Sequence, residues 1–284
     1  MSTGRTVPKD MSDSERFRKY SQYTFETSGH KKLGFIVNAI EREFGHAKCD
    51  VLDIGSGIGS VSFVVASYGH NVTGIEMSSS CIEYANSRKE DLELSNVTFS
   101  LRNAEDPVSH TGLYDVAICS EVLEHSYRPD IILSNVSKSL RDEGLAIITI
   151  PNGFGPFELT GRFLRTLTAT VKKTGIAKEI ASDLSLNKGK EQSVNVDVGS
   201  GHVQFFSWCR ICRLFEMSGL QIISVGSSDF ISGVMPLSFA IRKSKTLCRM
   251  DFKLADLLPK AFASGWYFVL KKKGVGEESQ ERVV

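Results

Sequence analysis

The sequence VLDIGSGIGS, residues 51–60, combines a short apolar run, an acidic residue and three glycines at alternate positions. The apolar run is typical of a buried strand, and Gly55, Gly57 and Gly59 allow the chain to turn without a Cβ in the way. In an open α/β sheet, a ligand lies beyond the carboxyl end of such a strand, where the chain enters the first helix. The stretch therefore predicts an α/β fold with a ligand-binding turn at these glycines.

Short β-rich runs recur along the rest of the chain. The first five are separated by stretches with room for crossover helices, which predicts a parallel sheet with helices on both faces. The last two runs are less regular and have a longer connection between them. The predicted strands are Asp50–Ile54, Asn71–Glu76, Val97–Leu101, Tyr114–Ser120, Leu145–Ile150, Gln221–Val225 and Trp266–Lys271.

Residues 152–205 interrupt this alternation and are locally basic. Between Thr160 and Lys190 there are seven basic and two acidic residues. One interpretation is a lid or docking surface for an anionic or lipid-linked molecule, because four apolar residues can share one helical face. The alternative is a cover helix with a solvated cationic face. The four apolar residues are Phe157, Leu164, Leu167 and Val171.

The predicted organisation has five parts. They are a helical cover segment (1–45), a ligand-binding core (46–151), the lid insertion (152–205), a C-terminal completion of the sheet (206–273) and a flexible tail (274–284). Within the cover segment, Tyr20 and Tyr23 are candidates for lining a substrate pocket, although core packing explains them equally well.

Composition bounds the class of protein and its location. The chain has 284 residues, with 34 basic and 33 acidic side chains and a formal net charge of +1, so no nucleic-acid partner is expected. Six scattered cysteines and an N-terminus without an apolar signal core predict reduced thiols and a cytoplasmic location. Cys209 and Cys212 form a single C-x-x-C in a segment with a helical pattern, and we expect both to be buried structural residues.

The residues around the glycine turn discriminate between cofactors. A dinucleotide fingerprint needs a third glycine where this chain has Ser60. Asp53, just before the turn, would repel a pyrophosphate but can receive the ammonium of an amino-acid moiety, which favours S-adenosylmethionine over NAD. Glu76 follows Gly55 by 21 residues, about the separation at which an acid meets ribose hydroxyls.

Five motifs in order carry a family resemblance: VLDIGSGIG, GIEMS, RNAED, YDVAICSEVLEH and GLAIITIPN. The region from about residue 30 to 151 resembles the class I S-adenosylmethionine-dependent methyltransferases, and within them the branch of the ubiquinone-biosynthesis O-methyltransferases. The resemblance implies a Rossmann-like, seven-stranded, mostly parallel sheet whose last strand is antiparallel. It also implies a cofactor site made by Asp53, Gly55, Ser56, Gly57, Gly59, Glu76, Met77, Asn103, Ala104 and Ser120.

Within that site, the resemblance places Asp53 and the glycines at the methionine moiety, Glu76 at the ribose, and Asn103 with Ala104 near the adenine. Asn103 departs from the family, which often has an acidic residue there. Simpler explanations exist for each residue. Asp53 or Ser56 can cap the first helix, Glu76 can be a surface acid, and Asn103 can be a turn residue.

Glu121, Glu124 and His125 stand at positions i, i+3 and i+4 after the fourth predicted strand, so in a helix their side chains would share one face. Two carboxylates and an imidazole can bind Mg²⁺ or another divalent metal, with His202 as a fourth ligand. The pattern resembles the metal-assisted arrangement of small-RNA 2′-O-methyltransferases. Alternatively, the acids favour a helix start capped by Ser120, and His125 acts as a metal-free general base.

The expected activity is methylation of a hydroxyl on a small or lipid-linked molecule such as a quinone precursor, glycolipid, sugar or secondary metabolite. Peripheral membrane contact through residues 157–173 is an accompanying expectation. The chain after Asn152 diverges from the ubiquinone branch. An RNA 2′-O-methyltransferase and a non-catalytic protein that binds S-adenosylmethionine are the two competing hypotheses.

Overall fold

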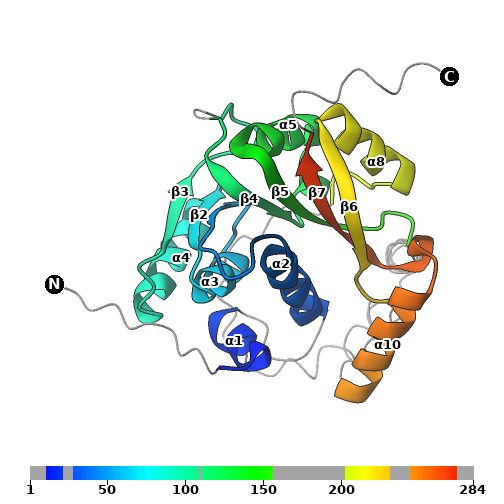
Figure 1. The fold of residues 1–284 in the computed structure, drawn as a ribbon, viewed down its shortest axis with the longest axis horizontal. Coiled ribbons are helices and arrows are strands. Elements are labelled where there is room, and N and C mark those ends of the chain that lie inside the picture. Colours follow the sequence, from blue (N-terminus) through cyan, green and yellow to red (C-terminus); the bar gives the residue numbers. More distant parts are fainter. Residues whose placement is uncertain (1–10, 22–27, 109–110, 156–201, 231–243, 274–284) are drawn as a thin grey trace, which may run out of the picture.

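The structure, a computed structural model, describes residues 11–21, 28–108, 111–155, 202–230 and 244–273. Seven strands form one sheet (Figure 1), and their order along the chain is β1 (Asp50–Ile54), β2 (Asn71–Glu76), β3 (Val97–Leu101), β4 (Tyr114–Ser120), β5 (Leu140–Pro151), β6 (Leu220–Ser227) and β7 (Gly265–Lys272). In space their order is β3-β2-β1-β4-β5-β7-β6.

Strand direction confirms the prediction of a mostly parallel sheet with an antiparallel last strand. All neighbouring pairs from β3 to β5 are parallel, whereas β7 runs antiparallel to both β5 and β6. The first four strands have the predicted bounds. β5 begins earlier than expected because Leu140 pairs with Tyr114, and a register shift follows before Val116.

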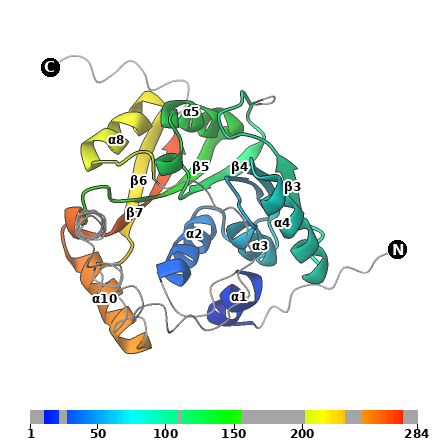
Figure 2. The ribbon, with the colours of Figure 1, turned by 180° about the vertical axis from the view of Figure 1, so that it is seen from behind.

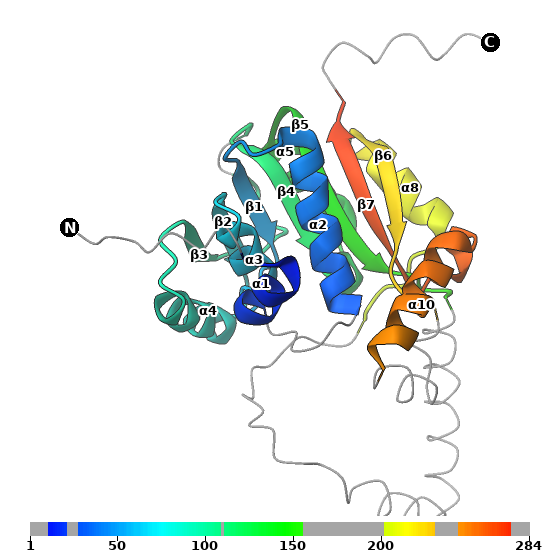
Figure 3. The ribbon, with the colours of Figure 1, turned by 60° about the horizontal axis from the view of Figure 1, so that its bottom comes forward.

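Helices cover both faces of the sheet, as Figures 2 and 3 show from behind and from below. One apolar core joins the sheet to the first helices of the chain, and a second core joins the other face to α5 and α8. The helices are α1 (Asp13–Tyr20), α2 (Ser28–Phe44), α3 (Ser60–Ser67), α4 (Ser79–Asp91), α5 (Pro129–Ser139), α8 (Trp208–Met217) and α10 (Lys245–Leu257), with short 3₁₀ turns η1 (Leu123–His125) and η3 (Lys260–Phe262).

Local sequence explains where several of these elements begin. The central strand β4 is buried from Val116 to Cys119, as expected of a parallel strand covered on both faces. Pro129 occupies the first turn of α5, where its missing N–H has no cost. The Ser78 and Ser207 side chains cap α4 and α8 by accepting backbone N–H bonds.

The connection between β3 and β4 differs from the other crossovers between the parallel strands. Its described residues, 102–108 and 111–113, contain no helix. The connection is short and carries Pro107 and Gly112, both of which oppose helix formation. A cavity of about 230 Å³ remains beneath β1, β2 and β3, with Leu52, Thr73 and Leu113 in its lining.

The C-x-x-C segment is helical, as predicted, because it lies in α8. However, the expectation that both of its cysteines are buried is wrong for Cys209, which is exposed, while Cys212 is half-buried. Tyr20 lies in the first apolar core, which supports the packing interpretation of that residue. No helix among the described residues is long and apolar enough to cross a membrane.

Candidate active site

The three glycines after β1 form the tight turn that the sequence predicts. Gly55, Gly57 and Gly59 have φ angles of 69°, 54° and 86°, which are left-handed values that favour glycine. A Cβ at Gly55 would lie 2.4 Å from Cγ2 of Val122, so this position must be glycine to pack. A Cβ at Gly57 would meet nothing within 4 Å, so the turn is open to a ligand there.

Asp53 lies in β1 directly before the turn and is only 2% exposed. Its Oδ2 accepts a hydrogen bond of 2.5 Å from the Ser62 hydroxyl in α3. Burial raises the pKa of Asp53 to about 7, an effect that the Ser62 hydrogen bonds oppose. Neither Asp53 nor Ser56 is the N-cap of α3, since Gly59 occupies that position without a side-chain cap. Capping therefore does not explain either residue.

Glu76 closes β2 and binds the backbone at the rim of the glycine turn. Its Oε2 accepts from the Gly57 N–H at 3.0 Å, and its Oε1 accepts from the N–H groups of Met77 and Ser78 at 2.8 and 2.9 Å. Glu76 is thus an ordered group of the turn rather than a loose surface acid. The neighbouring Met77 side chain is 72% exposed, which leaves an apolar surface beside the carboxylate.

The loop after β3 holds the two residues expected near an adenine. Asn103 forms a turn, because its Oδ1 accepts from the Glu105 N–H at 3.0 Å and its carbonyl accepts from the Asp106 N–H at 3.1 Å. The turn interpretation of Asn103 is therefore the one that the geometry supports. Asn135 of α5 donates to the carbonyls of Ala104 and Asp106 and ties this loop to the core.

The helix expected directly after β4 does not form. Glu121 has a φ of 58°, which turns the chain out of β4, and only the 3₁₀ turn η1 follows before Pro129 starts α5. Ser120 is not a cap, since its hydroxyl pairs with the Thr149 hydroxyl at 2.8 Å. Thr149 also donates to Glu121 Oε1 at 2.9 Å, so that Glu121 is directed toward β5.

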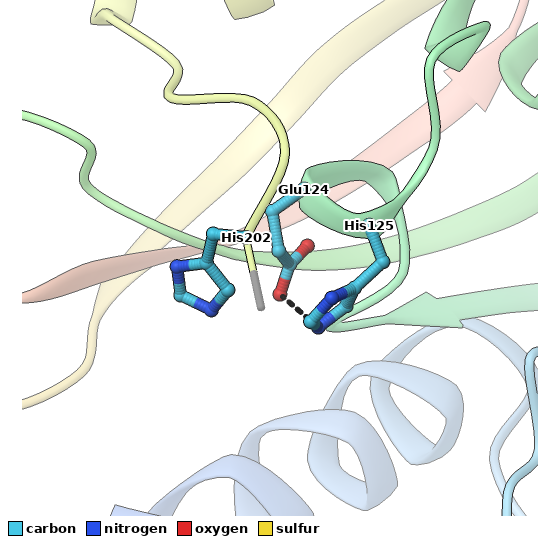
Figure 4. A group of neighbouring side chains, drawn as sticks. All are labelled: Glu124, His125 and His202. Carbon is cyan, nitrogen blue, oxygen red and sulfur yellow. Dashed lines mark ion pairs between the residues drawn. The ribbon is translucent and has the colours of Figure 1, made fainter. Parts of the chain in front are cut away.

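Glu124, His125 and His202 come together as one cluster, with ligand atoms within 4.8 Å of one another. Figure 4 shows the Glu124 carboxylate between the two imidazoles. Glu124 is fully buried, and its Oε1 lies 3.9 Å from Nε2 of His125, which is partly exposed. The ring centroids of the two histidines are 5.2 Å apart. Glu121 is not in the cluster, so the expectation of a four-residue ligand set is wrong for Glu121.

Backbone pairing brings His202 to this cluster from far along the chain. The N–H groups of Val203 and Gln204 both donate to the Glu124 carbonyl, at 2.9 and 3.1 Å. The Gln204 side chain donates to the Ser126 carbonyl at 2.7 Å. We call residues 202–206 the strap. Because the strap pairs with η1, the cluster does not depend on side-chain contacts alone.

The donor set of the cluster fits some metal ions better than others. One carboxylate and two imidazoles suit first-row transition ions, whereas Mg²⁺ prefers oxygen ligands. With Glu121 outside the cluster, the residues fit an ion such as Mn²⁺ or Zn²⁺ better than Mg²⁺, which is one of the divalent ions that the sequence pattern allows.

Four contributing residues have no signal in the sequence pattern. Ser62, Glu105, Ser126 and Gln204 act through hydrogen bonds to partners at least nine residues away in the chain, and such pairs have no fixed spacing. The Ser126 hydroxyl donates to Glu105 Oε1 at 2.6 Å and so joins η1 to the loop after β3. Residues 157–173, with the expected membrane contact, and Tyr23 lie outside the described residues, as does most of the insertion.

A family model described as a methyltransferase domain matches residues 45–205, which is more than half of the chain. The chain belongs to this methyltransferase domain family. The match spans both the glycine turn and the Glu124–His125–His202 cluster. The predicted family and the seven-stranded Rossmann-like fold are thereby confirmed.

Individual proteins similar to this chain include a curated methyltransferase and several solved structures. A ubiquinone biosynthesis O-methyltransferase of Rickettsia typhi is 32% identical over 126 residues, or 43% of this chain and 50% of that protein. The chain thus spans about half the length of this curated relative. Among solved structures, magnesium protoporphyrin IX methyltransferase from Synechocystis PCC 6803 has a TM-score of 0.52 at 17% identity, over 91% of this chain and 93% of that one. The cyclase SpnF has a TM-score of 0.56 at 14% identity, over 89% and 86%. These two likenesses show the fold alone.

Proposed function

We propose that the protein transfers a methyl group from S-adenosylmethionine to a hydroxyl of a small or lipid-linked molecule. The observation that carries this proposal is the convergence of Asp53, the open glycine turn and Glu76 at one edge of the sheet. A buried carboxylate is a partner for the cofactor's ammonium, and a second carboxylate can accept from both ribose hydroxyls. The cytoplasmic location expected from the sequence belongs to the same proposal.

The remaining cofactor contacts follow from neighbouring groups. The exposed Met77 side chain offers an apolar surface for the adenine ring, and the Asn103–Ala104 turn lies at the end of the adjacent strand. Ser120 and Ser56 line the same edge. Each of these roles is part of the proposal, and Asn103 contributes through its backbone, since its side-chain oxygen already accepts a hydrogen bond.

The Glu124–His125–His202 cluster is proposed to act on the acceptor. When bound, S-adenosylmethionine supplies a methyl group activated by the sulfonium charge. His125 takes the proton from the acceptor hydroxyl at an imidazole nitrogen, and the buried Glu124 carboxylate stabilises the resulting imidazolium. The 3₁₀ turn η1 and the strap hold these side chains in place, so that they lose little conformational freedom when the acceptor binds.

A divalent metal at the same three residues is the second candidate, favoured by the 4.8 Å grouping of their ligand atoms. Such an ion would lower the pKa of the acceptor hydroxyl. In that case the three side chains hold the ion, and His125 is not the base.

An RNA substrate and a non-catalytic role both receive less support. An RNA 2′-O-methyltransferase needs a surface that binds phosphates, and its basic candidate between Thr160 and Lys190 lies outside the described residues. A non-catalytic role is weakened by the Glu124–His125–His202 cluster, because binding of S-adenosylmethionine alone does not require it. The name O-methyltransferase in the Rickettsia typhi relative supports oxygen as the accepting atom.

The test is calorimetric titration of S-adenosylhomocysteine into the full chain, repeated with EDTA, Mg²⁺ and Mn²⁺. Asp53→Asn should weaken binding at least about tenfold, because a charge-assisted hydrogen bond is lost. Asp91→Asn, an exposed acid at the end of α4, is the matched control. A heat for Mn²⁺ itself that disappears in Glu124→Gln but persists in Glu121→Gln would assign the metal. Equal S-adenosylhomocysteine binding by the protein and Asp53→Asn would refute the cofactor site.

An acceptor arm completes the test. A prenylated catechol should become methylated at oxygen, whereas its fully O-methylated analogue should not react. His125→Gln should abolish turnover while leaving S-adenosylhomocysteine binding intact.

A further inference from the structure

Helix α10 has two apolar faces, and within the part of the chain that the structure describes only one of them is buried. Cys248 and Ala255 are 2% and 1% exposed and pack toward the protein. The opposite side carries a row of large apolar side chains at intervals of three, four and three residues, which is one face of a helix. Their exposed fractions are 44% for Leu247, 62% for Met250, 39% for Leu254 and 84% for Leu257. We call these four residues the apolar stripe.

The two described acids of α10 bind other parts of the protein, whereas its two described basic residues lie on the exposed side of the helix. Asp251 is 5% exposed and accepts from the Phe230 N–H at 3.3 Å, whereas the Asp256 side chain is 52% exposed but forms an ion pair of 2.8 Å with Lys31. Arg249 and Lys253 are both exposed. By helical spacing they lie between the buried face and the apolar stripe. The outward side of α10 is therefore apolar and basic.

The position of α10 relates the stripe to the candidate active site. The helix connects β6 to β7, and Gly265 at the start of β7 pairs with Pro151 at the end of β5. The connection thus lies at the sheet edge where β4 and β5 end, which is the edge with Ser120 and Glu121. Phe262 of η3, which is 51% exposed, is another apolar side chain in this connection between β6 and β7. Figures 1 and 3 show α10 at the outer margin of the molecule, beyond β6.

Charge distinguishes between the possible occupants of the stripe. Two copies of α10 packed stripe to stripe would bring their Arg249 and Lys253 side chains together, which opposes association. An anionic lipid surface has the opposite requirement, because it attracts the basic residues while its interface accepts the leucines and the methionine. We propose that the outward face of α10 docks the protein on membranes that contain anionic lipid.

Docking goes beyond methyl transfer and does not require it. Its use, the delivery of a lipid-linked acceptor to the sheet edge, rests on the proposed function. The two ideas are separable, because membrane binding is measured without cofactor or acceptor.

The experiment is co-sedimentation of the full chain with vesicles of phosphatidylcholine alone or mixed with phosphatidylglycerol. We expect binding to the mixed vesicles, weakened by salt. Met250→Glu and Leu257→Glu should each lower the partition coefficient at least about tenfold, because each removes buried apolar area and adds a charge that repels the lipid. Met217→Glu is the matched control, since Met217 is 73% exposed at the end of α8 and should bind as the unaltered protein does.

Several outcomes would overturn the proposal. They are no binding to mixed vesicles, equal binding to both vesicle types, or an effect of Met217→Glu as large as that of Met250→Glu. A dimer in solution that dissociates in Met250→Glu would assign the stripe to a second copy. A large loss of thermal stability in that variant without lipid would show that the chain itself covers the stripe. Titration with S-adenosylhomocysteine should be unchanged in Met250→Glu, so a failure of docking leaves the proposed function standing.

Discussion

Asp53 is a carboxyl group whose surroundings favour the proton. It is 2% exposed, and burial raises its pKa from 3.8 to about 7. Between these two values the folded state binds the proton more tightly than the unfolded chain does. The contribution of Asp53 to stability therefore falls as pH rises through this window and is constant above it. A cationic ligand beside the carboxylate would favour the ionised form.

The raised pKa of Asp53 leads to a prediction for cofactor binding. Below pH 7, S-adenosylhomocysteine should release up to about one proton as its ammonium approaches Asp53, because the carboxyl ionises on binding. Titration calorimetry in two buffers with different ionisation enthalpies measures the release. At about pH 8.5 the carboxyl is already ionised, so this contribution should vanish. Identical heats in both buffers at the lower pH would contradict the proposed contact.

At the scale of elements, the candidate site depends on short irregular segments rather than on long helices. The strap is hydrogen-bonded to the backbone of η1 at Glu124 and to Ser126 just after it, and Ser126 is bonded in turn to Glu105 in the loop after β3. The proposed cofactor side and the proposed acceptor side of the site are thus joined through one 3₁₀ turn. The Gln204 side chain is the strap's link to Ser126.

Gln204→Leu should displace His202 without disturbing the cofactor site, because it removes the donor to the Ser126 carbonyl. We expect a loss of about 1–2 kcal/mol in unfolding free energy, because the Gln204 side chain also accepts from the Arg210 guanidinium and two hydrogen bonds are lost. Nuclear magnetic resonance should show shifted imidazole signals of His202, with an S-adenosylhomocysteine affinity within about twofold of the original. Gln221→Leu, an exposed position on β6, should alter neither. Unchanged His202 signals would show that Gln204 does not position the histidine.

At the scale of the whole molecule, the two faces of the sheet are covered unequally. The crossover between β3 and β4 has no helix in its described residues, and the cavity of about 230 Å³ lies where such a helix would pack. Asn135 lines this cavity and also holds the loop after β3 through two carbonyls. Through Asn135, the cavity therefore borders the loop that is proposed to contact the adenine.

Filling the cavity should stabilise the protein. Thr73 lines it, so Thr73→Ile should raise the unfolding free energy by about 0.5–2 kcal/mol, the usual range for cavity-filling changes. Thr98→Ile is the matched control, because Thr98 pairs with Thr73 in the neighbouring strand but is exposed and outside the lining. Urea unfolding measures the free energy of unfolding of both variants, provided that its dependence on urea concentration is unchanged. An equal gain in both variants would mean that strand propensity, and not the cavity, is responsible.

The sequence by itself determined the features that repeat at short range. Short, continuous apolar runs located all seven strands, because a strand that is buried on both faces needs apolar residues throughout. The glycines and acids of the turn follow these strands at short intervals in the sequence. The sheet edge at which the glycine turn, Asp53 and Glu76 lie could therefore be predicted. The exposure of Cys209 could not be predicted, because it depends on what packs against α8.

Only the tertiary structure decided which polar groups meet. The E-x-x-E-H spacing predicted one helical face with Glu121, but the left-handed φ at Glu121 turned its side chain toward β5. The sequence offered His202 as a candidate fourth ligand, but no fixed sequence interval leads to it, and the backbone pairing of Val203 and Gln204 with Glu124 is what brings it to the cluster. Contacts between distant segments arise from the packing of the whole chain, whereas helix and strand patterns arise from neighbouring residues.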